Sequence, residues 1–264
     1  MKPIAKGPDK IVVIMVDGFG VPPEGWDKSV FHRLGGSEFA RLFRDCSAPL
    51  DATLGVEGLP QSATGQTALF TGVNAPELLG RHLPGFPNNR LADVVRSKNI
   101  FSEALDRGLS ACFANAYVRQ GLRELKILGC CSVTTVMTES ALKKVRGLRE
   151  LLDGDAVYHD LTRETLAPDF DVPRQTPARS AENLLSLSRR HNLTLFEYFL
   201  TDRAGHKSDP EALGGHLAEF AEFLLSLKAA LPPDTALLLS SDHGNCEDLS
   251  TKTHTRNPVP LLLL

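Results

Sequence analysis

Four runs of apolar residues in this chain have the length and composition of buried β-strands. They span residues 11–16, 193–201, 237–241 and 259–264 and are rich in Val, Ile, Leu and Phe. Strands that are apolar at successive positions, rather than at alternate ones, are typical of parallel sheets covered on both faces. Just before the second run, the amphipathic segment 180–190 predicts a helix with a buried leucine face. We therefore expect an α/β fold, in which helices sandwich a mostly parallel sheet.

An aspartate follows each of the first three runs. These residues are Asp17, Asp202 and Asp242; His206 lies four residues after Asp202, and His243 is next to Asp242. Because the carboxyl ends of parallel strands meet at one edge of a sheet, we expect the three carboxylates to converge. Carboxylates packed together repel one another, and either protonation or bound cations must relieve that repulsion. The nearby histidines favour cations.

A further imidazole, His254, follows His243 within a short loop. Carboxylate oxygens combined with imidazole nitrogens suit Zn²⁺, Mn²⁺ or Fe²⁺ better than Ca²⁺ or Mg²⁺ alone. Aspartate–histidine pairs also occur at strand ends that bind no metal, so one such motif is only a hypothesis. The repetition of the pattern at separate positions favours a metal site.

The segment 58–72 supplies a candidate nucleophile. It predicts a turn containing Pro60, then a helix over 63–70 that ends at Thr71-Gly72, with Ser62 at the N-cap. Capping the helix is the ordinary role of a serine at that position. A hydroxyl there can also attack phosphorus, because the exposed N–H groups and the helix dipole hold an anionic substrate. A metal ion on the hydroxyl would lower its pKa and activate it at neutral pH.

Together these motifs resemble the alkaline phosphatase superfamily, and most closely its cofactor-independent phosphoglycerate mutases and phosphopentomutases. The similarity rests on Asp17-Gly18, Gln61-Ser62-Ala63-Thr64-Gly65-Gln66, Asp202-x-x-x-His206, Asp242-His243-Gly244-Asn245-x-Glu247 and Thr253-His254-Thr255-x-Asn257-Pro258-Val259-Pro260. The resemblance implies an alkaline-phosphatase-like fold with two divalent ions, Mn²⁺ or Zn²⁺. One ion would be held by Asp202, His206 and His254. The other would be held by Asp17, Ser62, Asp242 and His243.

The same resemblance implies that Ser62 is the nucleophile and becomes a transient phosphoserine. Thr64, two residues further on, is the alternative nucleophile. Gln66 stands where the phosphoglycerate mutases usually have a histidine, and its amide can still form a hydrogen bond there.

The middle of the chain is shorter than in those mutases, which insert a large second domain after the nucleophile helix. Only 139 residues lie between Ser62 and Asp202 (202 − 62 − 1), and part of them must belong to the core. We therefore predict a core formed by 1–82 and 178–264 and a small inserted α+β cap, 83–177. Within the cap the patterns predict a helix over 90–105, strands over 110–116 and 132–137, and a linker over 160–177.

Several polar side chains near the core motifs or in the predicted cap are candidate substrate contacts. They are Gln66, Arg81, His82, Arg90, Arg119 and Arg123. Arginine binds phosphate and carboxylate groups through paired N–H donors. Most arginines stay exposed to solvent, so a solvated side chain is the alternative interpretation for each of them.

Composition limits the partners and the location. The chain has 264 residues, is 42% hydrophobic and 23% charged, and has a net charge of −3. Because it has no basic stripe, nucleic acid is an unexpected partner, and because its apolar runs are strand-sized, so is a membrane. The five cysteines are odd in number and fit no metal-ligand spacing, which favours reduced thiols in the cytoplasm.

Three functions follow from these patterns. The favoured one is a two-metal phosphatase or phosphomutase that acts on a small phosphate monoester through Ser62. A second is hydrolysis of another ester, a phosphodiester or a sulfate; the sulfatase signature Cys/Ser-x-Pro-x-Arg is absent, since 62–66 contains neither Pro nor Arg. The third is a non-catalytic binding protein stabilised by its metal ions, for which Ser62 would not be needed.

Overall fold

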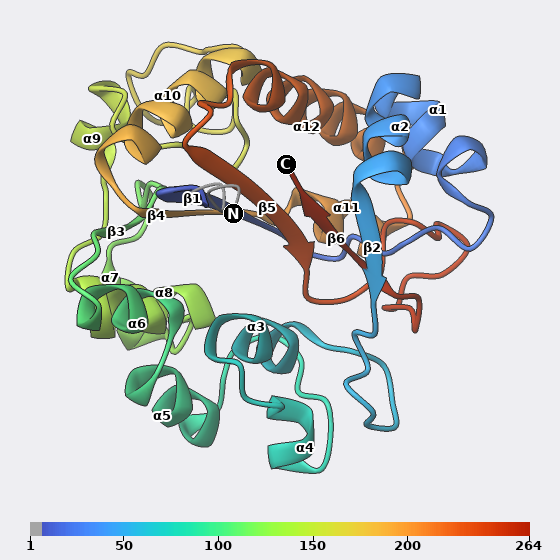
Figure 1. Ribbon diagram of the computed structural model, residues 1–264, viewed down its shortest axis with the longest axis horizontal. Coiled ribbons are helices and arrows are strands. Elements are labelled where there is room, and N and C mark those ends of the chain that lie inside the picture. Colours follow the sequence, from blue (N-terminus) through green and yellow to red (C-terminus); the bar gives the residue numbers. More distant parts are fainter. Residues whose placement is uncertain (1–6) are drawn as a thin grey trace, which may run out of the picture.

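The computed structural model describes residues 7–264, in which a six-stranded sheet lies between two layers of helices (Figure 1). The strands are β1 (Lys10–Val16), β2 (Ser47–Leu50), β3 (Ala111–Phe113), β4 (Leu193–Tyr198), β5 (Thr235–Ser241) and β6 (Val259–Leu263). Their order is β2-β6-β5-β1-β4-β3. β5, β1, β4 and β3 are parallel, whereas β6 is antiparallel to both of its neighbours. The predicted α/β fold is confirmed.

Four helices cover one face of the sheet: α1 (Val30–Gly35), α2 (Ser37–Cys46), α10 (Pro177–Arg190) and α12 (Pro210–Ala230). Their apolar side chains pack on alternate residues of β1, such as Val12 and Ile14, and on Phe196 of β4. Phe19, just after β1, stacks on Phe31 of α1 with ring centroids 4.2 Å apart. Within residues 7–264, no helix combines the length and the apolar character needed to cross a membrane.

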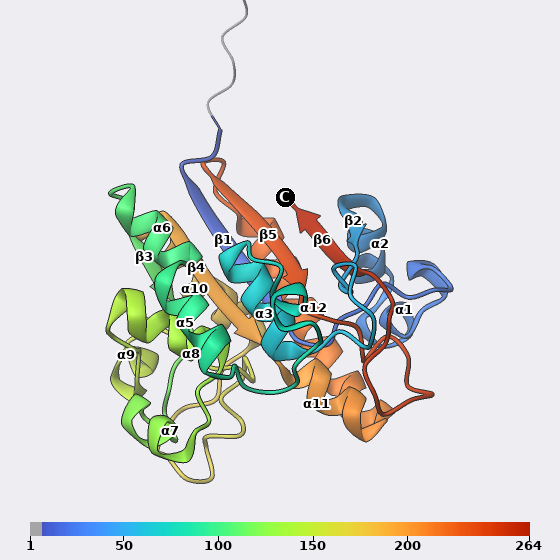
Figure 2. The ribbon, with the colours of Figure 1, turned by 90° about the horizontal axis from the view of Figure 1, so that it is seen from below.

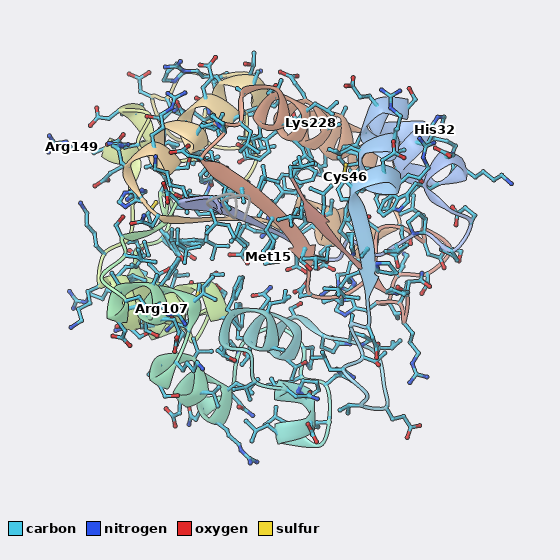
Figure 3. The ribbon with its side chains drawn as sticks, viewed as in Figure 1. Met15, His32, Cys46, Arg107, Arg149 and Lys228 are labelled. Carbon is cyan, nitrogen blue, oxygen red and sulfur yellow. The ribbon has the colours of Figure 1, made fainter. Side chains whose placement is uncertain are left out.

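The other face is covered by α3 (Ser62–Thr71), α5 (Asn89–Ser97), α6 (Ile100–Asp106) and α8 (Val133–Met137). Met15, labelled in Figure 3, packs on this side in one cluster with Phe70 of α3 and Phe101 of α6. The remaining elements are α4 (Ala75–Leu79), α7 (Leu122–Leu128), α9 (Leu148–Leu152), α11 (Leu200–Lys207), the 3-10 turn η1 (Trp26–Lys28) and the π-helical turn η2 (Thr138–Leu142). Figure 2 shows α11 beyond the arrowheads of β4 and β5.

Two predictions in the middle of the chain are wrong in detail. The helix expected over 90–105 is two helices, because Asn99 caps α6 and accepts hydrogen bonds from the N–H groups of Phe101 and Ser102. The strand expected over 132–137 is the helix α8. Its β-branched side chains are all buried, and Ser132 caps its N-terminus by accepting from Thr135 N. Tertiary burial and a good cap outweigh β propensity in this segment.

The predicted cap, 83–177, is not separate from the sheet. β3 lies within it and pairs in parallel with β4, and α5, α6 and α8 pack against the same sheet face. A smaller cluster that includes Leu151, Tyr158 and Leu166 forms its own apolar centre near the end of this range. The strand expected over 110–116 is the shorter β3, and the linker expected over 160–177 contains turns up to Thr176, the N-cap of α10. The boundary between a core and a cap stays a prediction.

Candidate metal centre and active site

The carboxyl ends of β1, β4 and β5 bring the three aspartates together. β1 is central and pairs in parallel with both of the other strands. Asp17 and Asp242 directly follow their strands, so they lie side by side at this edge. Asp202 does not directly follow its strand. β4 ends at Tyr198 rather than at Thr201, and Asp202 lies in the first turn of α11. The three carboxylates therefore converge as expected, although the second predicted strand was too long.

Asp17, Asp242 and His243 form a first cluster beside Ser62. Their ligand atoms lie within 4.8 Å of one another. His243 Nε2 lies 3.1 Å from Asp17 Oδ1, 3.7 Å from Asp242 Oδ2 and 3.0 Å from Ser62 Oγ. Ser62 is the first residue of α3, and Gln61 occupies the N-cap position. The predicted capping position of Ser62 is therefore wrong, and its hydroxyl faces the cluster instead.

Asp202, His206 and His254 form a second cluster. His206 Nε2 lies 3.1 Å from His254 Nε2 and 3.4 Å from Asp202 Oδ2, and His254 Nε2 lies 3.6 Å from Asp202 Oδ1. His243 stands between the two clusters, since one of its ring nitrogens is also within 4.8 Å of ligand atoms of Asp202 and His254. The resemblance assigned His243 to one ion only, whereas its position here is within reach of both sites.

Backbone carbonyls orient two of these imidazoles. His206 Nδ1 lies 2.8 Å from the carbonyl oxygen of Lys252, and His254 Nδ1 lies 2.8 Å from that of Pro60. A ring nitrogen that donates to a carbonyl carries the proton, so the other nitrogen, Nε2, keeps its lone pair. Both Nε2 atoms face the centre, as metal ligands would.

The electrostatics of the centre fit bound cations. Burial, and next the charge of Asp242, raise the pKa of Asp17 well above its ordinary value. Burial opposes protonation of His243, but the carboxylates of Asp242 and Asp17 outweigh it and raise its pKa to about 10. Burial and the positive charge of His243 lower the pKa of His254 to about 4. Asp17 Oδ1 is buried and, apart from the ion-pair contact with His243 Nε2 at 3.1 Å, has no hydrogen-bond partner among residues 7–264. A divalent ion would satisfy that oxygen and offset the carboxylate repulsion.

Comparison with known proteins identifies the superfamily. The family model described as "Metalloenzyme superfamily" matches residues 131–264, which is 134 of the 264 residues (264 − 131 + 1). The chain belongs to the metalloenzyme superfamily. This assignment rests on more than half of the chain, including Asp202, His206, Asp242, His243 and His254.

Solved structures share the fold of this metalloenzyme. Alkaline phosphatase from the Antarctic bacterium TAB5 is 14% identical, with 98% of this chain and 92% of that chain covered and a TM-score of 0.57. A mutant of that phosphatase has Mg bound. Alkaline phosphatase from Thermus thermophilus is 13% identical, with 91% and 60% of the two chains covered and a TM-score of 0.54. At these identities the likeness shows the fold alone.

Helix α3 packs directly on the carboxyl end of β5 in this metalloenzyme. A Cβ atom added at Gly65 would lie 2.5 Å from the carbonyl oxygen of Asp242, so only glycine permits this approach. Gln66 Nε2 then donates to Asp242 Oδ2 at 3.0 Å and to Asp17 Oδ2 at 3.4 Å. The spacing of Ser62, Gly65 and Gln66 thus places the hydroxyl, the close contact and the amide on one side of the helix.

Glu247 ties together the loops that carry the ligands. Its buried carboxylate accepts hydrogen bonds from Gly20 N at 3.0 Å and Asn245 N at 2.7 Å, and from Asn257 Nδ2 at 3.0 Å and the hydroxyl of Thr255. These donors come from the loop after β1, the loop after β5 and the segment that follows His254. One carboxylate therefore fixes three ligand-bearing segments relative to one another.

A cavity of about 650 Å³, named here the Ser62 cavity, extends from this centre. Ser62, Asp17, Gln66 and Asp202 form one end, and the rest of the lining comes from 85–86, 113–135, 158–165 and 197–203. Of the predicted substrate contacts, two contribute to the lining, Gln66 and Arg119. The other four do not line it; they are Arg81, His82, Arg90 and Arg123.

Two charged residues of the cavity were not predicted from the sequence, Glu197 and Arg203. Glu197 is buried within β4, and Thr134 Oγ1 donates to its Oε2 at 2.6 Å. Burial raises the pKa of Glu197 to about 7, the bond from Thr134 opposes this shift, and the charge of Asp242 adds to it. A carboxyl group inside an otherwise apolar run was the available signal. For Arg203 the signal was its place next to Asp202.

Proposed function

We propose that this metalloenzyme is a phosphatase that transfers the phosphoryl group of a small phosphate monoester to Ser62. The observation that carries the proposal is the position of the Ser62 hydroxyl. It stands at the first residue of α3, 3.0 Å from His243 Nε2, at the end of a cavity. The backbone N–H groups and the positive end of the α3 dipole favour an anion at this point. The alkaline phosphatases with the same fold support this class of reaction.

Two divalent ions, Mn²⁺ or Zn²⁺, fit the donor set. Asp202, His206 and His254 would hold one of them. The second would be held by Asp17, Asp242, His243 and Ser62, with His243 placed between the sites. Such ions neutralise phosphate oxygens and lower the pKa of a bound hydroxyl.

The chain's own groups then carry out two displacements at phosphorus. The Ser62 hydroxyl loses its proton to solvent, and its Oγ forms a bond to phosphorus while the ester P–O bond breaks. The leaving oxygen keeps the electron pair and takes a proton from water as the free alcohol. A water molecule next attacks the phosphoserine, which releases inorganic phosphate and restores the Ser62 hydroxyl. Gln66 holds the carboxylates of Asp17 and Asp242 in place during both steps.

Ser62 is a better nucleophile than Thr64 in this structure. Thr64 is fully buried, and its hydroxyl donates to the carbonyl oxygen of Gln61 at 3.1 Å and accepts from Leu83 N at 3.3 Å. It does not line the Ser62 cavity. Ser62 does, and it is only partly buried.

Access of water favours hydrolysis over return of the phosphoryl group to the substrate. A mutase has to keep its phosphoenzyme dry. Here the side chain of His206, within the second cluster, is 46% exposed. Solvent therefore reaches the centre, and water can accept the phosphoryl group from Ser62.

The test is Ser62→Ala, assayed on phosphate monoesters with Mn²⁺ or Zn²⁺ added. We expect turnover to fall about a thousandfold or more, because the attacking oxygen is removed. Bound metal, measured by elemental analysis, should persist because the other ligands are unchanged. Ser37→Ala is a matched control, since Ser37 is exposed and is also the first residue of its helix, α2.

Full turnover by the Ser62→Ala protein would refute the phosphoserine route. A wild-type protein that binds no metal and forms no labelled phosphoserine would refute the whole proposal. If an isomerised sugar phosphate accumulates in place of free phosphate, the enzyme is a mutase and not a phosphatase.

A further inference from the structure

Arg203 brings a positive charge into the Ser62 cavity without an acidic partner. It lines the cavity next to Asp202, and within the part of the chain that the structure describes it forms no ion pair and no hydrogen bond through its side chain. Its guanidinium lies over the ring of Phe199, 5.0 Å from the centroid. Such stacking fixes the orientation of a guanidinium and leaves its N–H donors at the edge. These donors are available to an anionic ligand.

Arg119, the other arginine of the cavity, is already engaged. It forms an ion pair with Asp169, donates to the carbonyl oxygen of Thr165, and lies 5.8 Å from the ring centroid of Phe170. Its charge is therefore largely matched by the chain itself. Among the cations that line the cavity, Arg203 is the one with unmatched charge.

The walls between Ser62 and Arg203 are rich in aromatic and aliphatic side chains. They include Phe86, Phe113, Tyr117, Val118, Tyr158 and Phe199. His159 stacks on Phe199 with centroids 4.6 Å apart, and burial lowers its pKa to about 4, so it is neutral at pH 7. A volume of about 650 Å³ is in the range that accommodates ligands with one or more rings. These surfaces suit an apolar, ring-containing group better than a strongly hydrated one.

The acidic groups of the lining do not cancel the charge of Arg203. Asp17 and Asp202 belong to the two clusters and would face the metal ions. Glu197 is buried, accepts from Thr134, and has its pKa raised to about 7, so only about half of it is ionised at neutral pH. Beyond the metal centre, the cavity therefore favours a negatively charged group.

We propose that Arg203 selects the leaving group: the preferred substrates are phosphate esters of aromatic alcohols that also carry a carboxylate. The phosphoryl group would lie at Ser62, the ring against the aromatic walls, and the carboxylate against the guanidinium of Arg203. The inference rests on the proposed phosphatase function and adds the class of alcohol. Arg203 is in this view a specificity-determining residue that binds the carboxylate of the alcohol, and the alcohol leaves after the ester P–O bond has broken.

The experiment compares three phosphate esters with the same ring. They are phenyl phosphate, 4-(carboxymethyl)phenyl phosphate and 4-(aminomethyl)phenyl phosphate, assayed for kcat/KM with the metal-loaded enzyme. We expect the carboxylate ester to exceed the ammonium ester, and Arg203→Gln to lower the carboxylate-to-phenyl ratio about tenfold. Taking the ratio removes differences in intrinsic reactivity and in enzyme quality. Arg149→Gln is the matched control, because the Arg149 side chain is 92% exposed on α9, at the outer surface (Figure 3).

The outcomes separate this inference from the proposed function. If wild-type enzyme hydrolyses all three esters with no preference for the carboxylate, or if Arg203→Gln slows the three equally, the leaving-group role of Arg203 is wrong while the phosphatase function stands. If Arg203→Lys restores most of the ratio lost in Arg203→Gln, the positive charge is confirmed as the cause. If no ester is hydrolysed by the wild-type enzyme, it is the proposed function that fails.

Discussion

Glu197 shows how one buried group couples stability to pH. It lies in the central part of the sheet, opposite Met15 of β1, and its pKa is raised from 4.5 to about 7 by burial. The folded chain therefore holds this proton more tightly than the unfolded chain does. Between pH 4.5 and 7 the unfolded state binds fewer protons, so the free energy of unfolding falls as the pH rises through that window.

Glu197→Gln is expected to remove this dependence. In chelator-treated protein, the difference in unfolding free energy, variant minus wild type, should increase by up to about 3 kcal/mol between pH 5 and pH 8.5, because only the wild type has a carboxyl group to ionise in the core. Urea unfolding of both proteins at a series of pH values measures this difference in unfolding free energy. Glu38→Gln, on the exposed surface of α2, is the control and should show a much smaller change. A difference that does not vary with pH would mean that Glu197 titrates normally.

At the scale of elements, the approach of α3 to β5 depends on one glycine. The missing side chain of Gly65 lets the helix lie against the backbone of Asp242, which sets the position of Ser62 and Gln66. A helix pushed away from this strand would carry its hydroxyl away from His243. The geometry of the candidate active site is thus sensitive to a position that does not line the Ser62 cavity.

We expect Gly65→Ala to lower the free energy of unfolding by about 1–3 kcal/mol, because the added Cβ overpacks the contact, and to reduce phosphatase activity strongly. Gly215→Ala in α12 is the matched control, since no atom lies within 4 Å of its added Cβ. That variant should be neutral or more stable by up to about 1 kcal/mol, from better helix propensity alone. Denaturant unfolding and activity are measured for both. A Gly65→Ala protein as stable and active as wild type would contradict the close packing.

The elements that could be predicted are those whose pattern reflects local chemistry. The apolar runs before Asp17 and Asp242 are strands in the structure, and the helix predicted over 63–70 is α3, which covers all of these residues. The strand predicted over 193–201 was too long because its apolar residues continue from β4 into the start of α11. Hydrophobic periodicity does not mark the change from strand to helix there. The spacing of Asp202 and His206, four residues apart, was the helical signal that remained.

At the scale of the whole molecule, the candidate ligands come from segments far apart in the chain. Convergence of the aspartates could be predicted because parallel strands share an edge, and the order β5-β1-β4 places them there. The cavity could not be predicted. Apart from the residues of the metal centre, its lining comes from segments between 85 and 203, whose packing no local pattern specifies. For Arg203 the one sequence signal was its place next to Asp202.

Because the candidate ligands come from distant segments, removing the metal ions should lower the stability of the whole fold. Ions that bind only the folded chain stabilise it by about 1.4 kcal/mol for each tenfold increase in free metal above the dissociation constant. We therefore expect a chelator to lower the melting temperature and added Zn²⁺ or Mn²⁺ to restore it. Asp202→Asn should lose part of the metal-induced rise, whereas Asp93→Asn, at an exposed position on α5, should retain it. A melting temperature that does not change when metal is removed or added would show that these side chains bind no metal.

The distance along the chain between Asp17 and His254 has a further consequence during protein synthesis. The central strand β1 emerges from the ribosome early, but its neighbours β4 and β5 and the loop with His254 follow much later. The full set of candidate ligands around Asp17 can therefore assemble only after residue 254 has been translated and has left the exit tunnel. While the residues between β1 and β4 are being translated, the apolar strand β1 has neither of its neighbours in the sheet, and an unpaired apolar strand is prone to aggregate.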